Sequence, residues 1–141
     1  MKLLTLLLLT GLTLFAGKKE KISEGEKIFQ AKCAACHIKL ITKEEALKDI
    51  KKLKAPPMVE VSNRLKEQII IKDDVDDMAK KGVVIAFIKD YVFNPDIEKS
   101  MCRAMAVDRF GVMPSQKGKL SEEELQTVAE WIYDYFEGKK F

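Results

Sequence analysis

The C-terminal end of the chain carries the clearest pattern of apolar and polar positions. Residues Leu120–Gly138 place apolar side chains at intervals of three and four, which gives a helix one apolar face. Ser121 and Glu124 have the spacing of a capping box, and the acidic residues at the start suit the positive end of the helix dipole. We therefore predict an amphipathic helix whose apolar face consists of Leu125, Val128, Ala129, Ile132 and Phe136, flanked by Trp131 and Tyr135.

A second helix is predicted between residues 18 and 30. Ser23 and Glu26 again have capping-box spacing, so the regular part of this helix begins just after Ser23. Gly25 and Phe29 are four residues apart and share one face. A glycine inside a helix costs up to about 1 kcal/mol relative to alanine. We expect a second helix to pack closely against Gly25 and to compensate for this cost.

The stretch between these two helices has weaker patterns, all of them helical, and the expected fold class is all-α. Thr42 and Glu45 form a third capping-box pattern, and Asn94-Pro95 stops a helix because proline cannot continue one. The acidic cluster Asp73, Asp74, Asp76 and Asp77 lacks the glycine and distal glutamate of a calcium loop, so we interpret it as a helix start. The predicted middle segments are Thr42–Lys54, the first part of Val59–Ile71, a short helix from the acidic cluster to Gly82, Val83–Phe93, and Asp96–Asp108.

The first 17 residues have the features of a secretory signal peptide. Lys2 gives a positive start, an apolar run follows up to Phe15, and Ala16-Gly17 offers small residues for cleavage. The run is shorter than the roughly 20 apolar residues that a membrane span needs. We expect removal of residues 1–17, which leaves one exported domain over residues 18–141; an uncleaved membrane anchor is the alternative.

The charge balance excludes one class of partner and suggests another. The chain has 25 basic and 22 acidic residues, and residues 1–17 contain one lysine and no acid, so the mature chain has 24 basic and 22 acidic residues. This balance does not indicate a nucleic-acid partner. Six lysines and three acids nevertheless fall between Lys39 and Lys54. The segment is either a solvated helix face or a docking surface for a redox protein partner.

The most specific motif is Cys33-Ala34-Ala35-Cys36-His37. This spacing predicts covalent haem attachment, with the two thiols bonded to one edge of the porphyrin and the histidine bound to the iron. His37 is the only histidine in the sequence, and only three cysteines are present. A redox dithiol and a zinc site completed by Cys102 are the alternatives. Cys102 is otherwise expected to be a buried apolar thiol, and less readily a redox-active or disulfide-forming one.

Gly25 and Phe29 followed by this haem motif resemble the N-terminal helix of the class I c-type cytochromes. The resemblance implies a cytochrome c-like fold in which the N- and C-terminal helices cross around one covalently bound haem c. It also implies that a proline carbonyl accepts a hydrogen bond from His37 and so fixes the orientation of the imidazole. Pro56 is the matching position, although the flanking residues differ from the family's pattern and Pro57 is the alternative.

The sixth ligand of the iron is predicted in the irregular stretch from Phe110 to Ser115. In the class I cytochromes a Met-Pro pair before the last helix carries the axial methionine, and Met113-Pro114 matches this pair. Phe110 is placed with the residues that contact the cofactor. Met58 is the fallback ligand, whereas the helical spacing of Met101 and Met105 indicates core packing. A lysine is a further alternative.

Histidine and methionine together leave no open position on the iron, which indicates electron transfer rather than catalysis. The resemblance therefore implies a periplasmic or otherwise exported carrier that passes single electrons between larger redox enzymes. Two alternatives stay open. The first alternative is a haem-containing subunit of a respiratory enzyme or of a sulfur- or nitrogen-oxide enzyme. The second is a haem sensor or enzyme with an open distal site.

Overall fold

The computed structural model describes residues 22–70 and 76–141. The predicted signal peptide, Asp73 and Asp74 lie outside these ranges. The fold class is all-α as predicted, because the described residues form helices and no strands. None of the described helices has the length and apolar character that crossing a membrane requires. The helices are α1 (Glu24–Lys32), α2 (Lys43–Lys48), α3 (Met58–Gln68), α4 (Asp77–Phe93), α5 (Ala104–Phe110) and α6 (Glu122–Tyr135), with a 3₁₀ turn, η1 (Ile50–Lys52), after α2.

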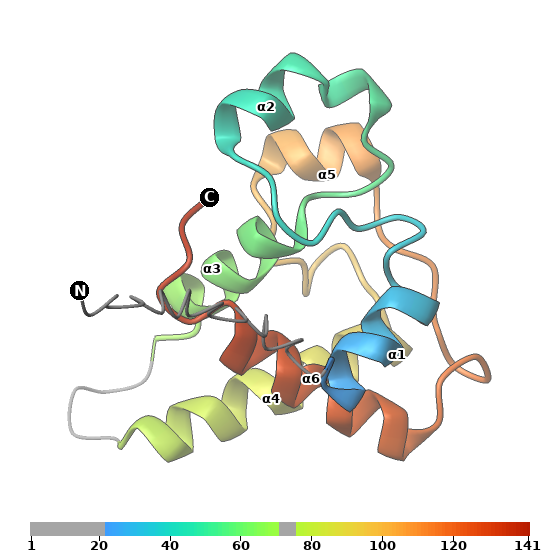
Figure 1. Cartoon of the computed structure of the whole chain (residues 1–141), viewed down its shortest axis with the longest axis vertical. Helices are drawn as coiled ribbons and strands as arrows, with labels where there is room; N and C mark the ends of the chain where they lie inside the picture. Colours follow the sequence, from blue (N-terminus) through green and yellow to red (C-terminus); the bar gives the residue numbers. More distant parts are fainter. Residues whose placement is uncertain (1–21, 71–75) are drawn as a thin grey trace, which may run out of the picture.

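The two terminal helices pack against each other, as the sequence predicts. Figure 1 shows α1 lying across α6, and α4 packs along α6 at the same end of the molecule. A Cβ added to Gly25 would lie 2.9 Å from the Thr127 carbonyl oxygen, and closer still to Trp131 Cβ. Phe29 packs against the Trp131 ring with the centroids 5.2 Å apart. The glycine in α1 therefore permits the close approach of α6.

Capping boxes set two of the predicted helix starts. Ser121 and Glu124 cap α6 reciprocally, and Thr42 and Glu45 do the same for α2. At α1 only half of the predicted box is present: the Ser23 hydroxyl accepts from the Glu26 amide, while the Glu26 carboxylate pairs with Lys39. A long-range ion pair has replaced the local bond.

Three middle segments differ from the prediction. The expected helix Thr42–Lys54 ends at Lys48 and continues only as the 3₁₀ turn. The expected break at Gly82 is absent, because α4 runs without interruption from Asp77 to Phe93. The expected helix Asp96–Asp108 begins only at Ala104, so Phe110 ends α5 and does not belong to the irregular loop. Propensity is a weak guide where packing against other helices decides the boundaries.

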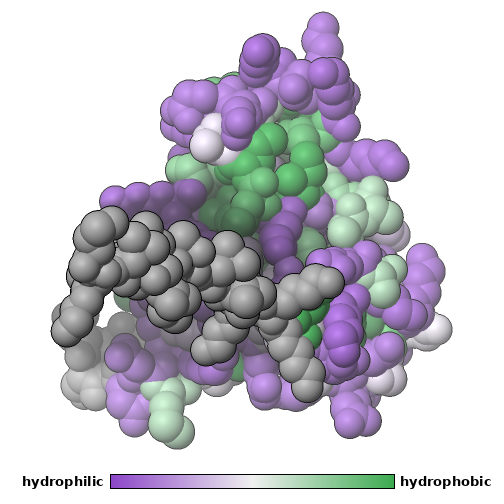
Figure 2. All heavy atoms as spheres, viewed as in Figure 1, coloured by the Kyte–Doolittle hydropathy of each residue, from purple (hydrophilic) through white to green (hydrophobic). Residues whose placement is uncertain are grey.

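The hydrophobic core joins the terminal helices to α3 and α4. The Ser62 hydroxyl of α3 donates to the Ile132 carbonyl of α6 at 3.4 Å, and the Lys66 ammonium donates to the Tyr133 carbonyl at 2.8 Å. α2 and α5 lie together at the other end, where Arg109 donates to the carbonyls of Ile50 and Lys51 (Figure 1). Figure 2 shows an apolar area on the viewed face just below α2, framed by hydrophilic side chains. The polar surface is interrupted there.

Candidate functional site

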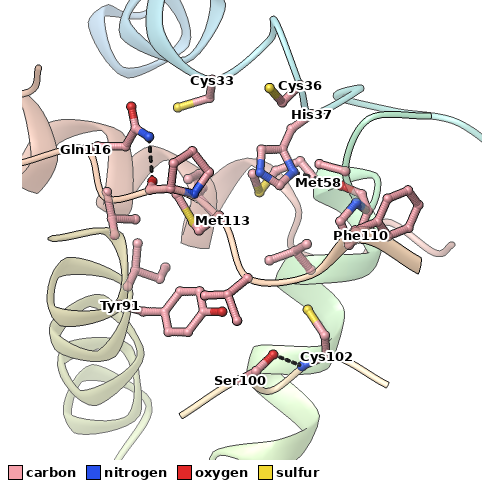
Figure 3. Close-up of a pocket in the computed structure, with 18 of the residues that line it drawn as sticks. Cys33, Cys36, His37, Met58, Tyr91, Ser100, Cys102, Phe110, Met113 and Gln116 are labelled. Carbon is pink, nitrogen blue, oxygen red and sulfur yellow. Dashed lines mark hydrogen bonds between the residues drawn. The ribbon is translucent and has the colours of Figure 1, made fainter. Parts of the chain in front are cut away.

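A cavity of about 340 Å³ lies between the helices. Its walls come from distant segments: the turn after α1, residues 54–58, α3, α4, residues 100–106, the loop after α5, and α6. A pocket of this size and origin is typical of a cofactor site. All residues predicted to contact a cofactor line it, and Figure 3 labels all of them except Pro56: Cys33, Cys36, His37, Pro56, Phe110 and Met113.

His37 is held at both its backbone and its side chain. Its amide and that of Cys36 donate to the Cys33 carbonyl at 2.9 and 3.1 Å, which closes the motif into a compact turn. His37 Nδ1 lies 2.8 Å from the Pro56 carbonyl oxygen, the bond that the resemblance implies. Because a carbonyl only accepts, Nδ1 carries the proton and Nε2 keeps its lone pair. Burial lowers the pKa of His37, against the opposing effect of the Pro56 bond, so the imidazole is neutral and Nε2 can bind a metal.

The two thiols of the motif are not joined in a disulfide. Burial, and secondarily the neighbouring Cys36, raise the pKa of the Cys33 thiol to about 11. A reactive dithiol depends instead on a lowered thiol pKa. At Cys33 the surroundings therefore do not favour the dithiol alternative.

The Met113 loop is fastened to the end of α4. The Ser115 hydroxyl donates to the Phe93 carbonyl at 2.6 Å, and the Gln116 amide donates to the Val92 carbonyl at 3.0 Å. The last carbonyls of a helix have no partner within the helix, so they are available to a neighbouring loop. The Gln116 side chain also donates to the Pro114 carbonyl at 2.7 Å. These bonds hold the backbone from Pro114 to Gln116, directly after Met113, which lies in the cavity wall (Figure 3).

The other methionines have less suitable positions. The Met58 amide donates to the Ile38 carbonyl at 2.8 Å, so Met58 lies beside His37 on the same wall. Met101 lines the cavity from the segment before α5 rather than from the predicted helix. The prediction that Met105 packs in the core is wrong, because its side chain is 70% exposed and does not line the cavity. Met113 is therefore the methionine that lines the cavity from the predicted Met-Pro loop, whereas Met58 and Met101 line it from other segments.

Cys102 also lines the cavity, but away from the motif. Figure 3 shows it at the opposite end from Cys33 and Cys36. It is half-buried rather than fully buried as predicted, and burial raises the pKa of its thiol. Within residues 22–70 and 76–141, no cluster of three or more His, Cys, Asp and Glu side chains could hold a metal ion. The zinc alternative, which needs Cys102 beside the motif, is therefore not assembled.

The charged groups that line the cavity are all basic. Among the described residues, no Asp or Glu side chain lines it. Such a lining favours a ligand that carries negative groups. The basic residues are Lys32, Lys54, Arg64 and Lys119.

Over residues 20–132 the sequence matches the family described as cytochrome C oxidase, cbb3-type, subunit III. The chain belongs to this family of c-type cytochromes. It is also 35% identical over 141 residues to a protein of Aquifex aeolicus (strain VF5) described as uncharacterized, with 94% of this chain and 87% of the relative covered. No solved structure matches. Membership of the family implies haem c with its iron as the cofactor and redox proteins as partners.

The cytochrome's cavity fits a haem c. Cys33 and Cys36 would hold one porphyrin edge, and the neutral His37 and the Met113 thioether would supply the iron ligands. The chemistry of this set agrees with the cofactor, since imidazole and thioether are the usual pair in cytochromes c.

Sequence reasoning missed several residues of the cavity wall. Phe87 and Tyr91 of α4 line it, because α4 turns one face toward the motif. Arg64 of α3 lines it as well, between the apolar neighbours Val61 and Leu65. A basic residue within the apolar face of a helix is a signal that the sequence did contain.

Proposed function

We propose that this cytochrome is exported, carries one covalently attached haem c, and transfers single electrons between larger redox enzymes. The sequence contains one Cys-x-x-Cys-His motif, which provides for one haem. The features of residues 1–17 support export to the periplasm. The observation that carries the proposal is the convergence of both motif thiols, His37 and Met113 on one cavity.

Each of these residues has a separate task. Cys33 and Cys36 anchor the cofactor, and their position at the end of α1 ties it to the packed α1–α6 pair. His37 would bind the iron through Nε2 in an orientation set by Pro56, and the Met113 thioether would supply the second ligand. When bound, haem c supplies reversible one-electron exchange, and a neutral thioether ligand raises its potential.

The surface for a partner is proposed around the predicted lysine segment. Lys39 and Lys52 are engaged in ion pairs with Glu26 and Asp49, so they are less available to a partner. The remaining lysines are exposed and suit transient, salt-sensitive docking of an acidic protein: Lys43, Lys48, Lys51 and Lys54.

A second candidate function is a permanent subunit of a respiratory enzyme. The family's description, which names a subunit of an oxidase, favours it. The site chemistry would be unchanged, and only the lifetime of the complex with the partner would differ. A chain that copurifies with one partner at high salt would support the subunit over the free carrier.

The deciding experiment is the visible spectrum of the exported protein, oxidised, reduced, and reduced with carbon monoxide. We expect sharp low-spin c-type bands, a methionine–ferric charge-transfer band, and no change with carbon monoxide. Denatured protein should retain the haem, because thioether bonds survive unfolding. High-spin bands that shift with carbon monoxide would support the sensor or enzyme alternative, and a haem-free protein would overturn the proposal.

A further inference from the structure

The end of the molecule that α2, η1 and α5 form contributes little to the hydrophobic core. α5 buries none of its side chains. Ala46 of α2 and Leu53 just after η1 are buried, but neither belongs to the core cluster that joins the other helices. Burial of apolar surface is the main force that holds helices together. At this end of the molecule, individual polar contacts therefore carry more of the task of holding α5 in place.

One side chain fastens α5 to η1. Arg109, in the last turn of α5, donates from Nη2 to the Ile50 carbonyl at 3.3 Å and to the Lys51 carbonyl at 3.2 Å. In the described part of the chain, no other hydrogen bond joins α5 to another element. The Asp49 carboxylate beside η1 is bonded to Lys52 instead. A guanidinium suits such a tie, because it stays protonated and presents several donors in a fixed plane.

The position of α5 determines where the Met113 loop begins. The guanidinium carbon of Arg109 lies 5.7 Å from the centre of the Phe110 ring, which lines the cavity. The Gly111 amide then donates to the Val107 carbonyl at 2.8 Å and ends the helix, with a φ of 67° at the glycine. Arg109 is therefore the last fixed point before Met113.

The Met113 loop is thus held on both of its sides. After the loop, hydrogen bonds to the last carbonyls of α4 hold the chain. Before the loop, Arg109 binds η1, and η1 leads within a few residues to Pro56, whose carbonyl accepts from His37. The Arg109 bonds therefore connect the segment that carries one predicted iron ligand to the segment that orients the other.

We propose that Arg109 is a positioning residue that keeps Met113 on the iron by tying α5 to the segment that orients His37, an inference that rests on the proposed function. While the bonds of Arg109 are intact, the loop cannot move away from the cavity together with α5. Loss of a hydrogen bond of this kind changes an equilibrium constant by about two- to tenfold. Removal of the tie should therefore raise the fraction of protein with Met113 detached by this factor.

The test measures how readily imidazole replaces Met113 in the oxidised holoprotein. Imidazole can occupy the sixth position only after Met113 has left, so its apparent affinity reports the detached fraction. We expect Arg109→Gln to raise this affinity about two- to tenfold, followed by loss of the methionine–ferric band. Arg109→Lys should raise it less, because an ammonium still donates to carbonyls. A side chain that only stabilised the fold would leave the affinity of the folded protein unchanged.

Arg103→Gln is the matched control for this change. Arg103 is the exposed N-cap residue of α5, so the substitution removes the same charge from the other end of the same helix. Its Nε lies 3.8 Å from the Glu60 carboxylate, and its side chain makes no hydrogen bond to the described residues. We expect this variant to bind imidazole with an affinity close to that of the wild type.

A second measurement uses the wild-type holoprotein alone. Coupling between two sites is reciprocal, so replacement of Met113 by imidazole should loosen the contact between α5 and η1. Hydrogen exchange should then become faster at the amides of Gly111 and Leu53, which close α5 and η1. Amides within α6 should keep their rates. This measurement decides the matter even if Arg109→Gln does not accumulate.

The outcomes separate this inference from the proposed function. Wild-type protein without covalently bound haem, or with haem but no methionine–ferric band, overturns both. A holoprotein that shows this band but binds imidazole equally well in Arg109→Gln and Arg103→Gln overturns the Arg109 assignment alone. Unchanged exchange at Gly111 and Leu53 when imidazole binds overturns the same assignment.

Discussion

Two parts of the cavity wall, the His37 wall and the Met113 wall, hold the predicted iron ligands in different ways. On one wall His37 is fixed at its side chain by Pro56 and at its backbone by the motif turn. On the other wall the Met113 side chain has no hydrogen bond to the described residues, and only the backbone that follows it is held, by Ser115 and Gln116. A thioether is a weak acceptor, so the chain can orient it only through the loop.

This difference indicates unequal rigidity. The His37 wall continues into α1, which packs against α6 through Gly25. The Met113 wall is a loop whose attachment to α4 depends on a few hydrogen bonds to the carbonyls of Val92 and Phe93. If both residues bind the iron as proposed, Met113 should therefore be lost as a ligand before His37 in any progressive destabilisation.

The largest effect is expected from Met113→Ala. The haem should stay attached through Cys33 and Cys36, while the sixth position opens and reduced protein binds carbon monoxide. The midpoint potential should fall by on the order of 0.1 V, a fraction of the roughly 0.8 V that axial ligands span. Spectroscopy and redox titration measure both effects. The control is Met105→Ala, which removes an exposed methionine outside the cavity and should change neither.

A Met113→Ala protein that keeps the methionine–ferric charge-transfer band would contradict the assignment. Met58 or Met101 would then be the ligand, and the comparison of the two walls would fail.

The next effect tests how firmly the His37 wall is anchored. Gly25→Val places a side chain against Trp131 Cβ and the Thr127 carbonyl, neither of which can move without shifting α6. We expect a loss of about 1–3 kcal/mol in the free energy of unfolding of the holoprotein, measured by denaturant titration.

Gly82→Ala is the matched control for this change. Gly82 also lies inside a helix, but a Cβ added there meets no atom within 4 Å. Alanine has the higher helix propensity, so stability should rise by up to about 1 kcal/mol. Equal losses in the free energy of unfolding for both variants would show that the close approach of α6 at Gly25 does not contribute to stability.

The smallest effect is expected from Ser115→Ala, which removes one bond between the Met113 loop and α4. Global stability should fall by about 0.5–1.5 kcal/mol, the usual worth of such a bond. The methionine–ferric band should disappear at lower denaturant concentration than the unfolding of the helices, measured by circular dichroism. Coincident transitions would argue that the loop is as rigid as the His37 wall.

The helix starts and the haem motif could be predicted because local interactions determine them. Capping boxes at Thr42 and Ser121 need only residues three apart, and the Cys33–His37 turn closes on itself. The same reasoning failed at Gly82, where the preceding acidic cluster suggested a short helix that ends at this glycine. α4 instead continues through Gly82 to Phe93 and packs against α6.

The resemblance extended prediction to contacts that no local rule provides. It implied the bond from His37 to a proline carbonyl across nineteen positions, and the structure identifies Pro56 rather than Pro57 as the acceptor. The roles of these residues toward a haem stay predictions.

The sequence by itself determined the helical class, the terminal helix pair and the attachment motif, because spacing along one segment encodes them. The tertiary structure decided which distant groups meet. It placed Met113 rather than Met105 at the cavity, separated Cys102 from the motif, and left Arg64 Nε buried without a partner. These outcomes depend on how α3, α4 and α5 pack around α6. Such long-range packing is the sum of many weak contacts that no single stretch of sequence records.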